Sequence, residues 1–264
     1  MDVLSEIISR KRERVAEAKK SVPVPEMRRR ENPHALRAAA RAEGINIIAE
    51  FKRRSPSKGM IRADANLSQI VESYKKGGAV GISVLTEEDY FNGSLDDLRT
   101  VKTTVDLPVL RKDFVFDEYQ VYESAAAGAD AILLIVAALD DETLWQLRRV
   151  AEEELGMDAL VEVHTSEEMK RAVASGAFLI GVNNRDLRTF EVSLDTSLSL
   201  AREAPSEALL ISESGLRSPD DLRRLREAGY HGFLIGETLM RSDNPEDALR
   251  NFVGAALRGR PSLK

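Results

Sequence analysis

The sequence predicts an α/β protein organised as a (β/α)8 barrel, and three observations support this fold class. Eight short apolar runs rich in Ile, Leu and Val recur along the chain, and nearly continuous runs of this kind are typical of parallel strands covered on both faces. Helical patterns separate the runs, whose starts lie 19 to 34 residues apart. This spacing is the length of one strand-plus-helix unit, so eight units favour a TIM barrel.

The predicted strands occupy, in chain order, residues 45–51, 79–85, 107–114, 131–138, 158–164, 177–184, 208–214 and 232–239. The predicted helices occupy residues 67–78, 94–105, 117–129, 140–156, 166–176, 193–204, 218–230 and 244–257. Several of these helices begin with Ser, Asp or Asn followed by acidic residues, which suit a helix N-terminus. No G-x-G-x-x-G motif follows the first strand, which argues against an open dinucleotide-binding sheet.

The chain divides into a barrel and two flanking segments. Residues 1–44 predict an N-terminal helical extension packed on the barrel, because Val3, Leu4, Ile7 and Ile8 have helical spacing and residues 34–44 form a second helical pattern. The pattern over residues 45–257 predicts the (β/α)8 barrel, which we expect to be the catalytic domain. Residues 258–264 are expected to form a C-terminal tail.

Composition narrows the classes of function. The net charge of −6 over 264 residues lacks the basic surplus of a nucleic-acid-binding protein. The chain has no cysteine and three histidines far apart in sequence, so we expect no disulfide, no thiolate nucleophile and no metal site. No apolar stretch approaches the ~20 residues of a membrane span. We therefore expect a cytoplasmic protein with neither a membrane nor a nucleic-acid partner.

Charged and polar residues interrupt the apolar runs where the strands end. Residues two apart on a strand share a face, so Glu50 and Lys52 point the same way. Further polar residues end the other strands, namely Lys112, Glu162, Asn183, Glu213 and Ser214. A single charge at a strand end is commonly part of a loop ion pair. Because buried unpaired charges are costly, this recurring set must either pair internally or hold a ligand at the carboxyl end of the barrel, where barrel enzymes build their sites.

Two glycines suggest a phosphate site, although each alone is also compatible with a simple turn. Gly215 and Gly236 follow the seventh and eighth strands beside predicted helix starts. The loops after these strands form a recurrent phosphate site in barrel enzymes. Ser55 and Lys58, in the loop after the first strand, are positioned to add to it.

The motifs "IIAEFKRRSPSKG", "VLTEEDYFNGS", "VLRKDF", "LVEVH", "GVNNRDL", "ISESGL" and "FLIGETLM" resemble the indole-3-glycerol phosphate synthase family of tryptophan biosynthesis. They occur in order between about residues 45 and 241 and involve seven of the eight strands. The resemblance implies a carbon–carbon lyase that converts 1-(2-carboxyphenylamino)-1-deoxyribulose 5-phosphate into indole-3-glycerol phosphate, CO2 and water. It implies no cofactor, and members of the family are often monomeric, so we expect a monomer.

The resemblance also implies roles for individual residues. Lys112 becomes the general acid of ring closure, Glu162 a base or charge stabiliser, and Lys52 the partner of the substrate carboxylate. The full catalytic set implied is Glu50, Lys52, Lys112, Glu162, Asn183, Glu213 and Ser214. The implied substrate-binding set is Ser55, Phe91, Phe114, Leu134, Arg185, Leu187, Gly215, Gly236 and Glu237, the last through its backbone. The chemistry itself suggests that a second cation and partial burial lower the pKa of a lysine while Glu50 raises it, so we expect the paired lysines and glutamates to be poised near neutrality.

Three alternatives stay open at this level. A sister barrel, phosphoribosylanthranilate isomerase, uses a cysteine–aspartate pair, and this chain has no cysteine. A non-catalytic or redesigned phosphate-binding barrel would keep the glycine loops but would not need both lysines. His164 shares a strand face with Glu162, and we interpret it as a structural or capping residue.

Overall fold

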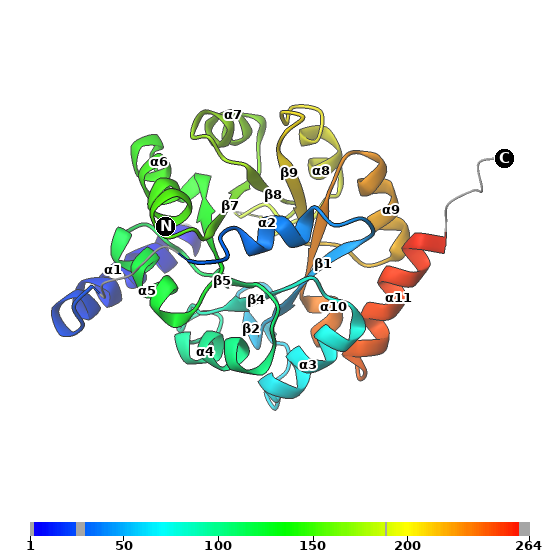
Figure 1. Ribbon diagram of the computed structural model, residues 1–264, viewed down its shortest axis with the longest axis horizontal. Helices are drawn as coiled ribbons and strands as arrows, with labels where there is room; N and C mark the ends of the chain where they lie inside the picture. Colours follow the sequence, from blue (N-terminus) through cyan, green and yellow to red (C-terminus); the bar gives the residue numbers. More distant parts are fainter. Residues whose placement is uncertain (1–2, 25–29, 188, 259–264) are drawn as a thin grey trace.

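The computed structural model describes residues 3–24, 30–187 and 189–258. Eight parallel strands close into a barrel in the order β1-β10-β9-β8-β7-β6-β5-β4 (Figure 1), which confirms the predicted (β/α)8 fold class. The barrel strands are β1 (Asn46–Phe51), β4 (Gly81–Leu85), β5 (Val109–Lys112), β6 (Ala131–Ile135), β7 (Asp158–Val163), β8 (Leu179–Asn183), β9 (Leu209–Glu213) and β10 (Gly232–Ile235). A two-stranded hairpin, β2 (Arg54–Ser55) and β3 (Gly59–Met60), follows β1.

Helices surround the barrel, and side-chain caps explain where several of them begin. The helices are α1 (Val3–Ser21), α2 (Ala35–Ala40), α3 (Leu67–Gly77), α4 (Leu95–Thr104), α5 (Glu118–Ala127), α6 (Asp141–Arg149), α7 (Ser166–Ala174), α8 (Asp195–Leu200), α9 (Pro219–Glu227), α10 (Glu237–Met240) and α11 (Pro245–Arg258). Ser218 and Asp221 form a reciprocal capping box at α9, which satisfies backbone N–H groups that the first helical turn leaves free.

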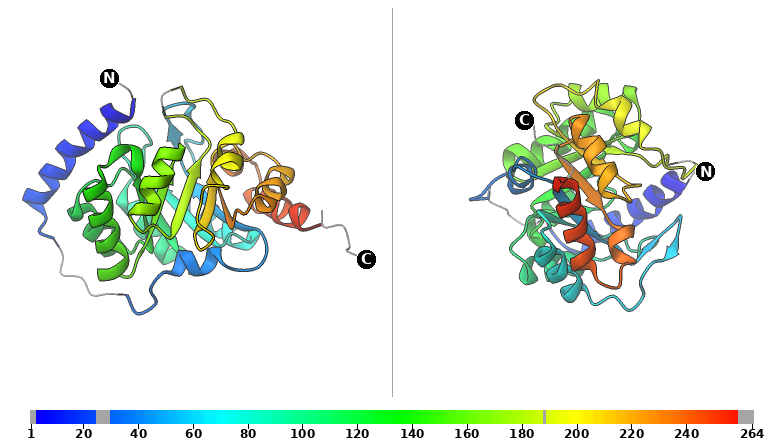
Figure 2. Two further views of the ribbon diagram at one scale, coloured as in Figure 1. Left: turned by 90° about the horizontal axis from the view of Figure 1, so that it is seen from above. Right: turned by 90° about the vertical axis from the view of Figure 1, so that its right-hand side faces the viewer.

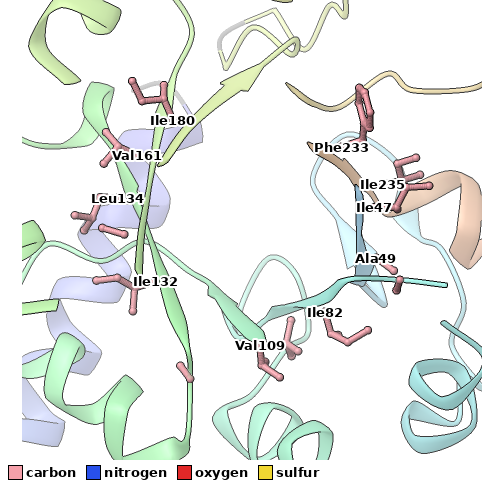
Figure 3. Packing of buried hydrophobic residues seen from close by; sticks show 14 of the residues in the cluster. Ile47, Ala49, Ile82, Val109, Ile132, Leu134, Val161, Ile180, Phe233 and Ile235 are labelled. Atoms are coloured by element: carbon pink, nitrogen blue, oxygen red, sulfur yellow. The ribbon is translucent and has the colours of Figure 1, made fainter. Parts of the chain in front are cut away.

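The strands separate two apolar cores. Alternate residues point outward and pack with the helices, and Figure 3 shows this outer set for Ile132, Leu134, Val161 and Ile180. The other residues fill the barrel interior, among them Ile48, Leu110, Leu133, Leu160 and Leu234. This division follows from the two-residue period of a strand.

The segment before β1 closes one end of the barrel. Leu36 of α2 is fully buried in the interior cluster, and a Cβ at Gly81 would lie 2.9 Å from its Cδ1 atom. Glycine at this position therefore allows α2 to approach the amino ends of the strands. Figure 2 shows α2 at the end opposite the β2–β3 hairpin.

Helix α1 lies along the side of the barrel, with its N-terminal end towards the hairpin (Figure 2). Its Lys11 is almost fully buried, and its Nζ atom lies 2.9 Å from both Asp113 Oδ2 and Glu88 Oε2. The helix is thereby fastened to the loops that follow β4 and β5. The division into extension, barrel and tail stays a prediction, and residues 259–264 of the predicted tail lie outside the described residues.

Most predicted elements are shorter than expected, and three of them also change into another kind of structure before the predicted end. Strand β6 ends at Ile135 and a 3-10 turn occupies Val136–Ala138, while the helix predicted over 140–156 changes after Arg149 into a π-helical turn, Val150–Glu154. The last predicted strand ends at Ile235, and α10 follows it. Among the residues the structure describes, no helix is long and apolar enough to cross a membrane.

Candidate active site

A cavity of about 700 Å³ opens at the carboxyl ends of the barrel strands. It collects most of the residues that the sequence singles out, which come from distant parts of the chain. These residues are Glu50, Lys52, Ser55, Phe91, Lys112, Phe114, Glu162, Asn183, Arg185, Leu187, Glu213, Ser214, Gly215, Gly236 and Glu237. A cavity of this size with a few convergent polar groups is typical of a small-molecule site.

One expected lining residue lies elsewhere. Leu134 is fully buried in the outer core, between the strands and the helices (Figure 3), so the prediction that it lines the pocket is wrong. Its neighbours Leu133 and Ile135 line the cavity instead. Residues Ala131, Leu133 and Ile135 share the inward face of β6, but because every residue of this strand is apolar, its sequence alone does not show which alternate set points inward.

Lys112 lies at the centre of the polar cluster. Its Nζ atom is 2.9 Å from Glu162 Oε2 and also contacts Glu213 Oε2. Burial alone would lower the pKa of Lys112, but Glu162, Glu213 and Glu50 outweigh it and raise this pKa above the ordinary lysine value. The ammonium is therefore held charged by carboxylates.

The two glutamates beside Lys112 differ in their electrostatics. Burial raises the pKa of Glu213 to about 7, a shift that Lys112 opposes and the charge of Glu162 reinforces. Burial also disfavours the charge on Glu162, but Lys112 and His164 outweigh it and lower the pKa of that carboxyl. Glu213 Oε1 is buried, and no hydrogen-bond partner for it occurs among the described residues. While Lys112 and His164 are charged, Glu162 is thus held as an anion, whereas Glu213 can exchange a proton near neutrality.

This arrangement corrects the expected electrostatics of the lysines. We expected a second cation and burial to balance the effect of Glu50 and keep the lysine pKa near neutrality, but the groups closest to Lys112 are carboxylates, which outweigh burial and raise its pKa. The group with a pKa near neutrality is Glu213. Gly181 of β8 leaves room for the Glu213 carboxylate, since a Cβ atom there would collide with Oε1.

A second ion pair forms on β1 and the residue after it. Lys52 Nζ contacts Glu50 Oε1, as their two-residue spacing predicts. The Tyr74 hydroxyl donates to the Glu50 carbonyl over 3.3 Å. A Cβ atom at Gly236 would collide with the Glu50 carboxylate, so glycine lets β10 approach this pair closely. The Glu50–Lys52 pair therefore has a defined place in the cavity wall.

Loops with unusual backbone conformation line another part of the cavity. Ser214 and Gly215 both have positive φ values, 64° and 78°, and a non-glycine residue in this region usually marks a functional constraint. The Glu237 carboxylate accepts a hydrogen bond from Arg241 Nε over 3.1 Å. Lys58 and Arg241 line the same cavity. Together these groups provide positive charge next to loops that can present backbone N–H groups.

Apolar side chains complete the cavity. The rings of Phe91 and Phe114 lie with their centroids 6.3 Å apart, and Leu187 lies in the same lining. Helix α1 adds Leu4 and Ile7, which the sequence marked only as one face of a helix. Within the described ranges, no group of three or more His, Cys, Asp or Glu side chains could hold a metal ion.

Comparison with known proteins identifies the family. The family model for indole-3-glycerol phosphate synthase matches residues 4–252. The chain belongs to this family. The indole-3-glycerol phosphate synthase of Bacteroides thetaiotaomicron is 45% identical over 258 residues, covering 96% of this chain and 98% of that protein. Those of Polaromonas naphthalenivorans and Laribacter hongkongensis are 47% and 48% identical, and cover 96% and 94% of this chain and 99% and 97% of theirs.

A solved structure supports the fold alone. A protein described as KGPDC from Streptococcus mutans superimposes with a TM-score of 0.61 at 16% sequence identity, covering 82% of this chain and 99% of that one. The motifs that resembled the indole-3-glycerol phosphate synthase family in the sequence therefore reflect membership of that family. The position of each motif at a strand end explains why they meet in one cavity.

Proposed function

We propose that this chain catalyses the indole-3-glycerol phosphate synthase reaction, the conversion of 1-(2-carboxyphenylamino)-1-deoxyribulose 5-phosphate into indole-3-glycerol phosphate, CO2 and water. The observation that carries the proposal is the contact of Lys112 with both Glu162 and Glu213 inside a cavity that also holds the Glu50–Lys52 pair. Family membership supports the same reaction.

Lys112 is the proposed general acid for ring closure. When the aryl carbon attacks the ketone, its oxygen gains negative charge and needs a proton, which a charged buried ammonium can supply. Glu162 is the proposed charge stabiliser, because its low pKa keeps it anionic beside Lys112. Glu213, with a pKa near neutrality, is suited to accept and release a proton during loss of water.

Lys52 is the proposed partner of the substrate carboxylate, the group that leaves as CO2. Its ammonium contacts Glu50, which would hold it in place before the substrate arrives. Asn183 and Ser214, also in the cavity wall, are proposed to order the substrate hydroxyls. Each role needs a polar group that faces the cavity rather than the core.

The phosphate and the aromatic ring are assigned to the remaining lining. We assign the phosphate to Ser55, Gly215, Gly236 and the backbone of Glu237, whose carboxylate is engaged by Arg241. We assign the ring to the apolar wall and to Arg185 at its edge. The wall consists of Phe91, Phe114, Leu133, Ile135 and Leu187. The chain is further proposed to act in the cytoplasm as a monomer, without nucleic-acid or membrane partners and without a cofactor, in keeping with its acidic charge.

The deciding experiment supplies the carboxyphenylamino substrate to the purified chain and follows indole absorbance in the presence of EDTA. The expected result is indole formation with one CO2 released per indole, at a rate that EDTA does not change. A folded protein that binds the substrate without forming indole would instead indicate a non-catalytic barrel. Light scattering of the same sample, expected to give about the 29.3 kDa of one chain, tests the monomer.

A further inference from the structure

His164 lies behind the catalytic cluster and connects two carboxylates. It follows β7, with only 10% of its side chain exposed. Its Nε2 atom lies 3.3 Å from Glu162 Oε1, on the carboxylate whose other oxygen faces Lys112. Its Nδ1 atom lies 3.1 Å from Glu168 Oε2, and the same oxygen accepts the His164 backbone N–H over 2.7 Å. The imidazole therefore lies between one carboxylate inside the cavity wall and one on α7.

Two carboxylate oxygens on the two ring nitrogens determine the protonation state of the ring. A neutral imidazole has one donor nitrogen and one acceptor nitrogen, so one carboxylate would face a lone pair. With both nitrogens protonated, Nδ1 donates to Glu168, and Nε2, which has no hydrogen-bond partner among the described residues, faces Glu162 Oε1 as the cationic half of an ion pair at 3.3 Å. In agreement with this geometry, and although burial opposes it, Glu162 and Glu168 raise the pKa of His164 to about 10. His164 is thus a buried cation next to the anion that contacts the general acid.

The proposed reaction needs a supply of protons, an argument that rests on the proposed function. Ring closure places one proton on the ketone oxygen, and loss of water places a second on the departing hydroxyl. Rearomatisation releases one proton from the new five-membered ring. The negative charge of the substrate carboxylate disappears as neutral CO2, so each turnover takes up one proton. After donating to the ketone oxygen, Lys112 is a neutral amine and must be protonated again.

A second cavity, of about 760 Å³, lies beside His164 and adjoins the first, with Asn183, Arg185 and Leu187 in both linings. The charged side chains that face His164 or line this cavity are Glu162 of β7, Glu168 of α7, and Arg185, Asp186 and Glu191 of the loop after β8. Glu168 keeps 17% of its side chain exposed, whereas Glu162 keeps 3%. Exposure thus decreases from Glu168 to Glu162, which gives the direction from solvent to Lys112.

We propose that His164 is a positioning residue and proton relay that holds Glu162 as a carboxylate and returns a proton to Lys112 through it. The Nε2–H bond breaks and an O–H bond forms on Glu162 Oε1. A half-turn of the carboxyl group presents that proton to the lone pair of Lys112 Nζ, which forms the new N–H bond. The imidazole is then neutral with its remaining proton on Nδ1, so a half-turn of the ring is needed to present the bare nitrogen to the second cavity, where it takes up a proton from solvent. Charge and protons then balance over each turnover.

The first test replaces the ring and restores it from solution. His164→Ala is expected to lower kcat by about 10²-fold, the low end for a lost proton transfer, with a smaller change in KM. Added imidazole, with the second cavity as its entry, should restore kcat with a saturating dependence on concentration. Pyrazole is the matched control, because it has the same ring size but stays neutral at the assay pH. Equal rescue by pyrazole would show that the ring is only a filler and would overturn the relay.

The second test changes the ring's partner rather than the ring. Glu168→Gln removes the carboxylate from Nδ1 and lowers the pKa of His164, so the alkaline decline of kcat should move to lower pH. Glu167→Gln is the control on the same helix, since Glu167 is exposed and, within the described part of the chain, forms an ion pair with Lys170 alone. An unchanged pH profile in Glu168→Gln, or a kcat for His164→Gln within about twofold of the parent, would contradict the proposal.

A third readout does not depend on turnover. The chain has only three histidines, so NMR of labelled protein can follow each ring. The His164 ring is expected to stay protonated at pH 8, whereas burial, aided by nearby arginines, lowers the pKa of His231 and leaves it neutral. A His164 ring that is neutral at pH 8 would overturn the relay. If the parent forms no indole, the proposed function fails; if it forms indole and the His164 variants match it, only the relay fails.

Discussion

The two ends of the barrel both bury charge, but they satisfy it differently. At the amino end, Asp158 is fully buried, its Oδ1 atom lies 3.2 Å from His34 Nδ1, and its Oδ2 atom accepts the Arg37 backbone N–H over 2.8 Å. Asp130 likewise places one oxygen 2.7 Å from Arg30 and the other 2.6 Å from Lys102. Each of these carboxylate oxygens has a donor without a ligand, although Nε of Arg30 and Nε of Arg37 have no hydrogen-bond partner among the described residues.

At the carboxyl end, by contrast, not every buried carboxylate oxygen has a donor. Here Glu50, Glu162 and Glu213 share Lys52 and Lys112, and within the described part of the chain Glu213 Oε1 has no partner. Buried polar atoms without partners are rare in native proteins and call for a reason. The comparison teaches that buried carboxylates stabilise the fold where each of their oxygens is paired, and prepare chemistry where a substrate must complete the pairing.

The largest expected effect comes from removing the central cation. Lys112→Ala should lower kcat by at least about 10²-fold, because it removes the general acid. The barrel should still fold, since Glu213 can take up a proton and avoid a buried unpaired charge. Lys102→Ala, at the amino end beside Asp130, is the control and should leave kcat unchanged. Initial rates of indole formation measure both, and a Lys112→Ala variant with more than about a tenth of the parent kcat would exclude the acid role.

The next effect concerns the amino end of the barrel, where the buried carboxylate oxygens are paired. Asp158→Asn should lower the free energy of unfolding by about 1.5–3 kcal/mol, the value of hydrogen bonds to a charged group. Urea unfolding curves measure this change. Asp106→Asn serves as the control, because Asp106 is exposed and pairs with Lys75 at the surface, where ion pairs contribute about 0–1 kcal/mol. Equal losses in the two variants would mean that burial adds nothing to the Asp158 cluster.

Two glycines, one lining the cavity and one away from it, allow a functional and a structural backbone position to be compared. Gly215→Ala and Gly229→Ala place alanine at positive φ values, 78° and 108°, which should cost each about 1–2 kcal/mol of stability. Gly215→Ala should lose more than Gly229→Ala, because its Cβ atom would collide with Val192 Cγ1. Only Gly215 lines the cavity, while a Cβ at Gly229 meets open space. We expect KM to rise about 10-fold for Gly215→Ala, with a smaller change in kcat. A similar rise for Gly229→Ala would remove the phosphate assignment from the loop at Gly215.

The last effect is a change in how stability depends on pH. Because burial raises the pKa of Glu213 from 4.5 to about 7, the folded state binds that proton more tightly than the unfolded chain. The contribution of Glu213 to the free energy of unfolding therefore decreases as pH rises from 4.5 to 7. Glu213→Gln removes this contribution, so the variant should gain stability relative to the parent across this window. Parallel curves of stability against pH would contradict the raised pKa.

Much of this architecture could be predicted from local patterns in the sequence. Continuous Ile, Leu and Val runs indicated the barrel strands, and the spacing of Glu50 and Lys52 indicated a shared face. The choice of Leu134 over Leu133 failed because an apolar run does not show which residues point inward; only the alternation with Ala131 and Ile135 decides it.

The partners of the charged residues could not be predicted in the same way. The contact of Lys112 with Glu213 joins residues 101 apart in sequence, and it depends on the closure and register of the barrel. The raised pKa of Glu213 depends on burial, which no motif reports. The part played by α1 was missed for a similar reason, since its apolar face could equally have covered the outside of the barrel.

The most direct test of the contrast between the two ends measures the free energy of unfolding and kcat for both Lys112→Ala and Asp158→Asn. The free energy of unfolding of Lys112→Ala and the kcat of Asp158→Asn complete the pair of measurements above. We predict that Lys112→Ala loses activity with little loss of stability, and that Asp158→Asn loses stability but keeps the parent kcat at a temperature where it is folded. If both variants lose activity and stability together, the two ends of the barrel do not have separate roles and the proposed division is wrong.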